Sequence, residues 1–167
     1  MRISKVTIDK AFLVSQQAFQ MNRILDRIVS VLSVDFAASQ ASNILHLKYA
    51  HFYPAPLADF GNEILDMWNE KVDYLVTEEN KAEYDNILEI FQKILDENLK
   101  LYDLVKDVIY TAFQEGDMNV FSHFLKYMDM LNKAIAQSIL LRDKAVLMND
   151  NVALFDFSFP SFFTFEV

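Results

Sequence analysis

The sequence contains no cysteine, only two glycines and only three prolines among its 167 residues. Without cysteine, the chain can form no disulfide, no thiolate metal site and no cysteine nucleophile. The scarcity of glycine and proline argues against an all-β fold, which spends these residues on its many turns. These absences favour a few long helices, and the lack of cysteine fits a reducing compartment.

Basic residues are also scarce, since 15 of them stand against 24 acidic residues and leave a net charge of −9. Nucleic-acid binding needs clustered lysine and arginine, so we expect no nucleic-acid partner. The sequence lacks a run of about 18 apolar residues, so we expect no membrane span. Its N-terminal stretch MRISKVTIDKAF lacks the apolar core of a signal peptide. A cytoplasmic protein is therefore the expectation.

Apolar material is plentiful, because 53% of the residues are hydrophobic and only 23% are charged. This balance is typical of a folded chain with a core and not of a disordered one. A length of 167 residues predicts one domain, which we assign to residues 1–150, followed by an aromatic tail over residues 151–167.

The first half of the chain shows apolar residues at helical spacing in two segments. The first segment covers residues 9–52, and its pattern leaves open whether it forms one long helix or two helices joined near residues 33–35. Pro54 and Pro56 end it, because proline does not continue a helix. The second helix is predicted over residues 57–76.

Two further helices are predicted in the second half of the chain. Asn80, followed three residues later by a glutamate, can cap the start of the third helix. Gly116 suits the left-handed position that ends it, and Asp117 suits the cap of the fourth, which runs to about Met148. Four long amphipathic helices predict an all-α fold, an antiparallel four-helix bundle.

A polar residue, Asn98, interrupts the apolar row of the third helix. The periodicity places Asn98 inside the bundle, Asp96 outside and Glu97 on the border. A buried asparagine needs hydrogen-bond partners, and we expect them to be His46 or Asn43. This polar layer is interpreted as structural, with a catalytic role as the alternative.

Two histidines and two carboxylates are the candidate metal ligands. His46 and His51 lie five residues apart, which is about 140° around a regular helix, so they cannot bind one ion together. Each histidine can instead join carboxylates from another helix in an iron, manganese or zinc site. Asp59 and Glu63, four residues apart, can present oxygens from one helix face. The alternative is that these four side chains are packed or solvated.

Three stretches resemble a known family. HLKYAHFYPAPLADFGNEILDMWNEKVDYL resembles the junction of the first two helices in starvation-induced mini-ferritins, and LDENL and EGDMNVFSHFLKYMDML are similar to later ferritin segments. The resemblance covers roughly residues 9–147. It implies a ferritin-like bundle that self-assembles and binds or oxidises iron, with His46, Asp59 and Glu63 at the positions nearest to the family's ligands. The chain departs from the ferritins in lacking a Glu-x-x-His motif and in having a short connection between the second and third helices.

The C-terminal segment LFDFSFPSFFTFEV alternates apolar and polar residues, which is typical of a half-buried strand. We expect an extended tail that docks in a groove of its own bundle or of a neighbouring subunit. The alternative is a motif that pairs with another protein. The phenylalanines available for such a partner are Phe155, Phe157, Phe159, Phe162, Phe163 and Phe165.

Two hypotheses for function follow from these features. The first is a non-enzymatic interaction or scaffold protein of ferritin-like type that forms homo-oligomers, such as a bacterial or phage accessory protein. The second is a ferritin-like protein that binds, oxidises and stores iron. The first is the prediction, and the second is the alternative that the resemblance supports.

Overall fold

The computed structural model of the chain describes residues 3–50, 54 and 76–166. Its helical elements in chain order are α1 (Lys5–Val34), α2 (Ser39–Leu45), the π-helical turn η1 (His46–Ala50), α4 (Ile87–Glu115), α5 (Met118–Met148) and α6 (Val152–Phe162). The described residues contain no strand, and the predicted all-α helical bundle is confirmed. The helix predicted over residues 57–76 lies almost wholly outside the described residues.

The first predicted segment forms two helices and not one. After Val34 the chain turns through Ala37, whose φ of 51° is left-handed, and the N–H of Ala38 donates to the carbonyl of Leu32 at 2.8 Å. This bond gives the carbonyl of Leu32 a partner at the end of α1, where helical carbonyls lack one within the helix. Ala38 is completely buried, so the small side chain at this position lets α2 return against α1.

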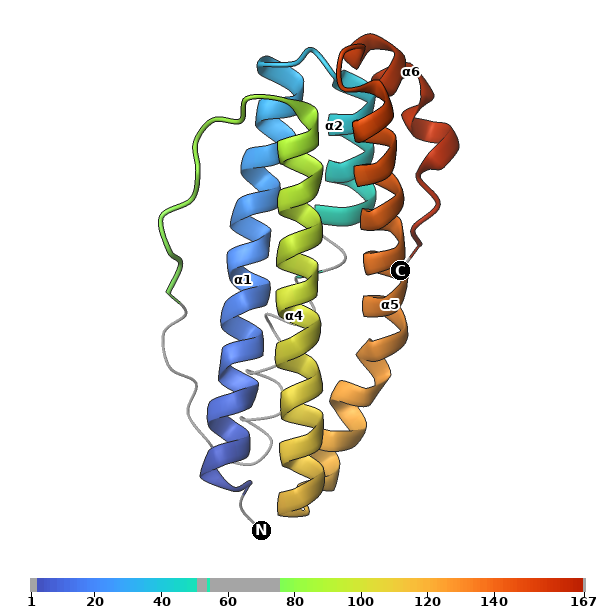
Figure 1. Cartoon of the computed structure of the whole chain (residues 1–167). Coiled ribbons are helices and arrows are strands. Elements are labelled where there is room, and N and C mark those ends of the chain that lie inside the picture. Colours follow the sequence, from blue (N-terminus) through green and yellow to red (C-terminus); the bar gives the residue numbers. More distant parts are fainter. Residues whose placement is uncertain (1–2, 51–53, 55–75, 167) are drawn as a thin grey trace.

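A long connection precedes α4, contrary to the short one expected from the sequence. Residues 76–84 form no helix and run along the outside of α1 (Figure 1). Gln20 of α1 holds this connection at two points. Its Oε1 accepts from the N–H of Glu78 at 3.0 Å, and its Nε2 donates to Asn80 Oδ1 at 2.6 Å. Farther along, Arg27 Nε donates to the carbonyl of Ala82 at 2.9 Å.

The start of α4 is therefore later than predicted, and the cap is Asn86 and not Asn80. Asn86 Oδ1 accepts from the N–H of Glu89 at 2.9 Å, and the carboxylate of Glu89 accepts from the N–H of Asp85 at 2.8 Å. The arrangement is similar to a capping box, except that the glutamate accepts from the N–H one residue before the cap, and it satisfies two backbone donors. A cap with this reciprocal partner outcompetes Asn80, whose side chain is already bonded to Gln20.

The turn between α4 and α5 forms as the sequence predicts. Gly116 has a φ of 75°, which glycine adopts without steric cost. Asp117 occupies the N-cap position of α5, but its side chain makes no cap hydrogen bond there. Its carboxylate instead bonds to residues near the N-terminus. Asp117 Oδ2 accepts hydrogen bonds from Ser4 Oγ at 2.6 Å and Thr7 Oγ1 at 2.5 Å, which joins the start of α1 to this turn.

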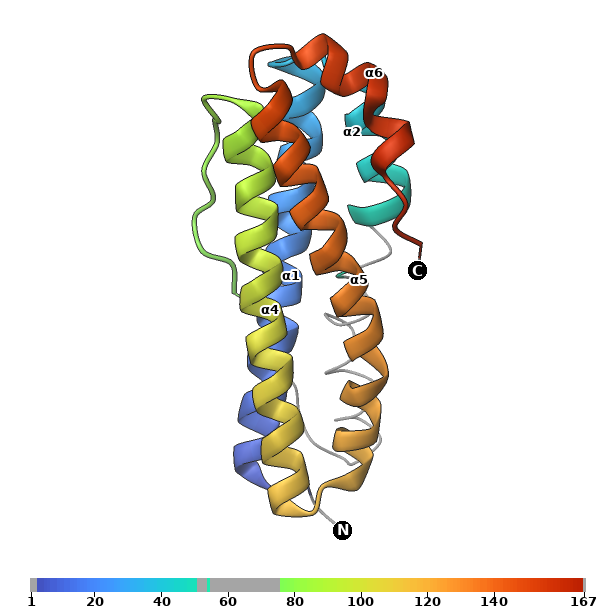
Figure 2. The same cartoon turned by 45° about the vertical axis from the view of Figure 1, so that its right-hand side comes forward.

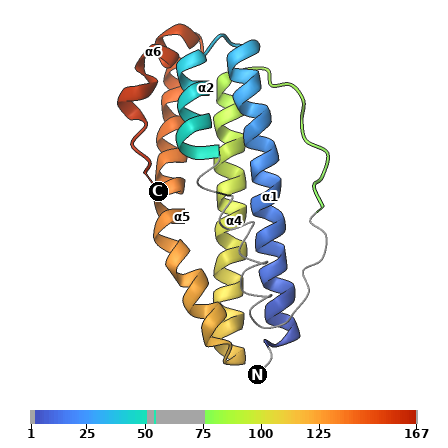
Figure 3. The same cartoon turned by 180° about the vertical axis from the view of Figure 1, so that it is seen from behind.

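The aromatic tail is helical through Phe162, contrary to the extended strand that was expected. Its phenylalanines fit the two-residue alternation of a strand and also the turn of a helix, because positions 155, 159, 162 and 163 share one helical face. Asn151 Oδ1 caps α6 by accepting from the N–H of Leu154 at 3.0 Å. Packing of that face against α2 and α5 decides in favour of the helix (Figures 2 and 3).

Among the described residues, the buried core is built mainly from α1, α4 and α5. Phe91 of α4 contacts the tail, with its ring 5.1 Å from that of Phe155 and 6.2 Å from that of Phe159.

None of the described helices combines the length and the apolar character that crossing a bilayer requires.

Candidate functional site

A buried layer of neutral polar side chains lies in the middle of the bundle. Asn98 of α4 is fully buried, and its Nδ2 donates to the hydroxyl of Tyr49 at 2.8 Å and to Ser138 Oγ at 2.5 Å. Ser138 in turn donates to the carbonyl of Ala134 at 2.7 Å. The prediction that Asn98 points inward is confirmed, but its partners come from η1 and α5 and are not His46 or Asn43.

Tyr49 is held in its protonated form. Burial raises the pKa of its phenol to about 12, and the hydrogen bonds with Asn98 and Ser138 offset only part of this rise. The ring also packs edge-on against Phe165 at 5.2 Å between centroids and against Phe163 at 6.3 Å. Tyr49 therefore carries no charge at neutral pH and joins the polar layer to the tail.

Glu97 is the carboxylate nearest to this layer in sequence, and it lies at the border of the bundle as predicted. Its carboxylate accepts from Gln17 Nε2 at 2.6 Å and from Lys93 Nζ at 2.9 Å. Burial alone would raise the pKa of Glu97, but the bonds from Gln17 and Lys93 outweigh it and hold the pKa below its ordinary value. Glu97 is thus an ionised carboxylate with its charge already neutralised.

Of the four predicted metal ligands, His46 is the one that lies in the part of the chain that the structure describes. His46 is the first residue of η1 and is exposed. His51, Asp59 and Glu63 lie outside the described residues. Among residues 3–50, 54 and 76–166, no three histidine, aspartate or glutamate side chains converge on a common point. The predicted set therefore stays a prediction.

The last residues of the tail are held by one side chain that sequence reasoning missed. Gln137 of α5 donates from Nε2 to the carbonyl of Phe162 at 2.9 Å. Its Oε1 accepts from the N–H groups of Thr164 at 2.7 Å and Phe165 at 2.9 Å. The sequence gives one weak signal for this role, a glutamine one turn after the inward-facing Ala134.

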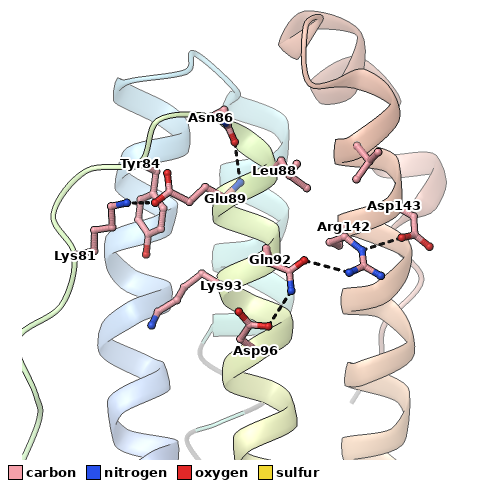
Figure 4. Close-up of a pocket in the computed structure, with 11 residues that line it drawn as sticks. Lys81, Tyr84, Asn86, Leu88, Glu89, Gln92, Lys93, Asp96, Arg142 and Asp143 are labelled. Carbon is pink, nitrogen blue, oxygen red and sulfur yellow. Dashed lines mark hydrogen bonds and ion pairs between the residues drawn. The ribbon is translucent and has the colours of Figure 1, made fainter.

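An open groove of about 780 Å³ lies between the start of α4, the later part of α5 and the connection before α4 (Figure 4). Its charged groups are satisfied locally: Lys81 pairs with Glu89, and Arg142 donates to Asp143 Oδ1 at 2.8 Å and to Gln92 Oε1 at 3.1 Å. With three basic and three acidic lining residues, the groove has no excess charge to attract an ion.

Comparison with known proteins identifies the fold. The sequence matches no model of a protein family and no curated protein. The structure is similar to a novel open pore ferritin from the hyperthermophilic archaeon Archaeoglobus fulgidus, with a TM-score of 0.85, 14% identity and 96% of each chain covered. An engineered closed form of the Archaeoglobus fulgidus ferritin (0.84, 14%) and a humanized archaeal ferritin (0.85, 11%) are similar over the same 96% of both chains. The chain therefore has the ferritin-like fold.

Proposed function

We propose that the chain is a non-enzymatic structural subunit that assembles with copies of itself through the outer face of α6. The observation that carries this proposal is the pair Leu154 and Phe157, which lie three residues apart on one face of that helix. Their exposed fractions are 46% and 76%. Large apolar side chains gathered on a surface favour association, because contact removes them from water.

The helix that carries this face is held in place by the rest of the chain, which favours a specific contact. Asp156 Oδ1 of α6 accepts from the N–H of Ala41 in the first turn of α2 at 2.8 Å. On the opposite side of α6, Phe155 and Phe159 are fully buried. A preformed surface loses little conformational entropy on binding. The other five tail phenylalanines are buried or nearly so in the chain itself, so Phe157 is the tail aromatic that we assign to a partner.

The non-enzymatic part of the proposal rests on the centre of the bundle. Among residues 3–50, 54 and 76–166, the groups that meet there are an amide, a phenol and a serine hydroxyl, from Asn98, Tyr49 and Ser138. Iron prefers carboxylate and imidazole ligands, so these neutral groups do not fit an iron centre. Their hydrogen bonds instead tie α4 to η1 and α5, which suits a structural role.

The experiment is the solution mass of the full chain and of two variants. Phe157→Asp places a charge on the proposed contact, whereas Phe113→Asp, at a position with an exposed fraction of 61%, makes the same change near the end of α4. We expect Phe157→Asp to dissociate the assembly and Phe113→Asp to leave it intact. Dissociation by Phe113→Asp alone, or by neither variant, would refute α6 as the contact.

Iron binding and oxidation form the second candidate function, favoured by the likeness to archaeal ferritins. Its ligands would be His46, His51, Asp59 and Glu63. Metal-free protein is mixed with ferrous iron in air, and oxidation is followed by absorbance. Our proposal expects no oxidation above the protein-free rate. Rapid oxidation that is lost in the double variant His46→Ala, Asp59→Ala would establish the second candidate instead.

A further inference from the structure

Asn98 has more hydrogen-bonding capacity than its neighbours use. A side-chain amide offers two donors and one oxygen that can accept twice. Both donors of Asn98 are engaged, one by Tyr49 and one by Ser138. No donor among the described residues reaches Asn98 Oδ1, although this atom is buried. A buried acceptor without a partner is costly, and native proteins rarely leave one.

Turning the amide over does not remove the problem. The oxygen would then face the hydroxyls of Tyr49 and Ser138, and the two hydrogens of Nδ2 would point to where Oδ1 now lies. The Ser138 hydroxyl hydrogen is already committed to the carbonyl of Ala134 at 2.7 Å. Either orientation therefore leaves one end of Asn98 that needs a group beyond those described.

The surroundings decide what kind of group fits. The phenol of Tyr49 is neutral, because burial raises its pKa to about 12, and Ser138 is uncharged. A metal cation needs several oxygen ligands with negative charge among them, and a single amide oxygen does not meet that need. The fitting ligand is a small, uncharged hydrogen-bond donor.

We propose that Asn98 Oδ1 binds one resident water molecule inside the bundle. Buried waters of this kind satisfy polar groups that the chain leaves unpaired. The tail packs against this region, because Phe163 and Phe165 contact the ring of Tyr49 and Gln137 bonds to the backbone at both ends of Phe163. The enclosed water therefore exchanges slowly with solvent. This inference is independent of self-assembly.

The test counts long-lived internal waters by oxygen-17 magnetic relaxation dispersion on the full chain. Asn98→Leu replaces the amide by an apolar group of similar shape, and we expect one fewer long-lived water. Ser138→Ala removes a neighbour but keeps Oδ1, so the count should equal that of the unmodified protein. An unchanged count in Asn98→Leu would overturn the proposal.

A crystal structure of the unmodified chain provides a second test that needs no variant to fold. We expect a water oxygen within about 3 Å of Asn98 Oδ1, at ordinary hydrogen-bonding distance. A protein donor at that position, or a dry apolar contact, would overturn the proposal.

Discussion

The side-chain oxygen of Gln137 on α5 accepts the backbone N–H of Phe165 at 2.9 Å, although 28 residues separate them. The same side chain bonds to the carbonyl of Phe162 and the N–H of Thr164. One glutamine thus gives hydrogen bonds to three backbone groups. These groups have no partner within a helix, because the chain leaves α6 at this point. The tail is held against its own bundle by this contact as well as by its aromatic rings.

Gln137→Leu should release the end of the tail. The variant leaves three backbone groups without a partner, and we expect a loss of about 1–3 kcal/mol in the free energy of unfolding. Urea denaturation measures the loss, and limited proteolysis should show faster cleavage after Phe162. Gln114→Leu, at an exposed position, is the matched control and should change stability by less than about 0.5 kcal/mol. Equal stability of the two variants would show that Gln137 does not hold the tail.

Asp117→Ala should loosen the start of α1. The carboxylate accepts from Ser4 Oγ and Thr7 Oγ1, and the loss of bonds to a charged acceptor should cost about 1.5–3 kcal/mol. Hydrogen exchange should increase in the first turns of α1 more than in the middle of α4. Asp129→Ala removes an exposed carboxylate paired with Lys133 at 3.1 Å and should cost less than about 1 kcal/mol. A larger cost for Asp129→Ala would contradict the assignment.

Tyr49 should make the fold sensitive to alkaline pH. Its pKa is about 12 in the folded chain against 10 for an exposed tyrosine, so the unfolded chain loses this proton first as pH rises. The stability from Tyr49 is therefore complete below pH 10 and is lost between about pH 10 and 12. Burial also raises the pKa of Tyr84, so absorbance at about 295 nm should show a late tyrosine titration to which more than one residue contributes. Its amplitude should fall in Tyr49→Phe and stay the same in Tyr110→Phe, a position with an exposed fraction of 61%. An amplitude that Tyr49→Phe leaves unchanged would refute this.

His123 should oppose folding in acid. Burial, and then the charge of Lys126, lowers its pKa to about 4, and the ring packs 5.3 Å from that of Tyr127. Between about pH 6.5 and 4 the unfolded chain takes up a proton that the folded chain does not, so stability falls as pH falls. The difference in unfolding free energy between the wild type and His123→Gln should change across this window. His46→Gln, at an exposed position, is the control, and a constant difference for His123→Gln would contradict the account.

The sequence carried enough information for the helical frame because helical periods and caps are local signals. The helical spacing of the apolar residues predicted that Asn98 lies inside the bundle. The left-handed conformation of Gly116 was predicted from its residue type. The partners of Asn98 could not be read, because Tyr49 is positioned by a π-helical turn that alters the register of a regular helix. Ser138 reaches the layer only through the packing of α5 on α4, which no local pattern encodes.

Two other predictions from the sequence, the helix cap at Asn80 and the extended tail, were wrong for similar reasons. Asn80 looked like a helix cap, but Gln20 of α1 takes its side chain, and this long-range bond is invisible in the sequence. The tail pattern fits both a strand and a helix, and only burial against Phe91 distinguishes them. The predicted metal ligands come from different segments of the chain. Their spacing in the sequence makes them candidates, but it does not show whether they lie close together in space.

The mass of the chain in solution decides whether it assembles with copies of itself, as we propose. Light scattering coupled to size-exclusion chromatography at micromolar concentration gives the mass of the full chain without reference to its shape. We predict a defined multiple of the 19.4 kDa chain mass. A single species at 19.4 kDa would contradict the account.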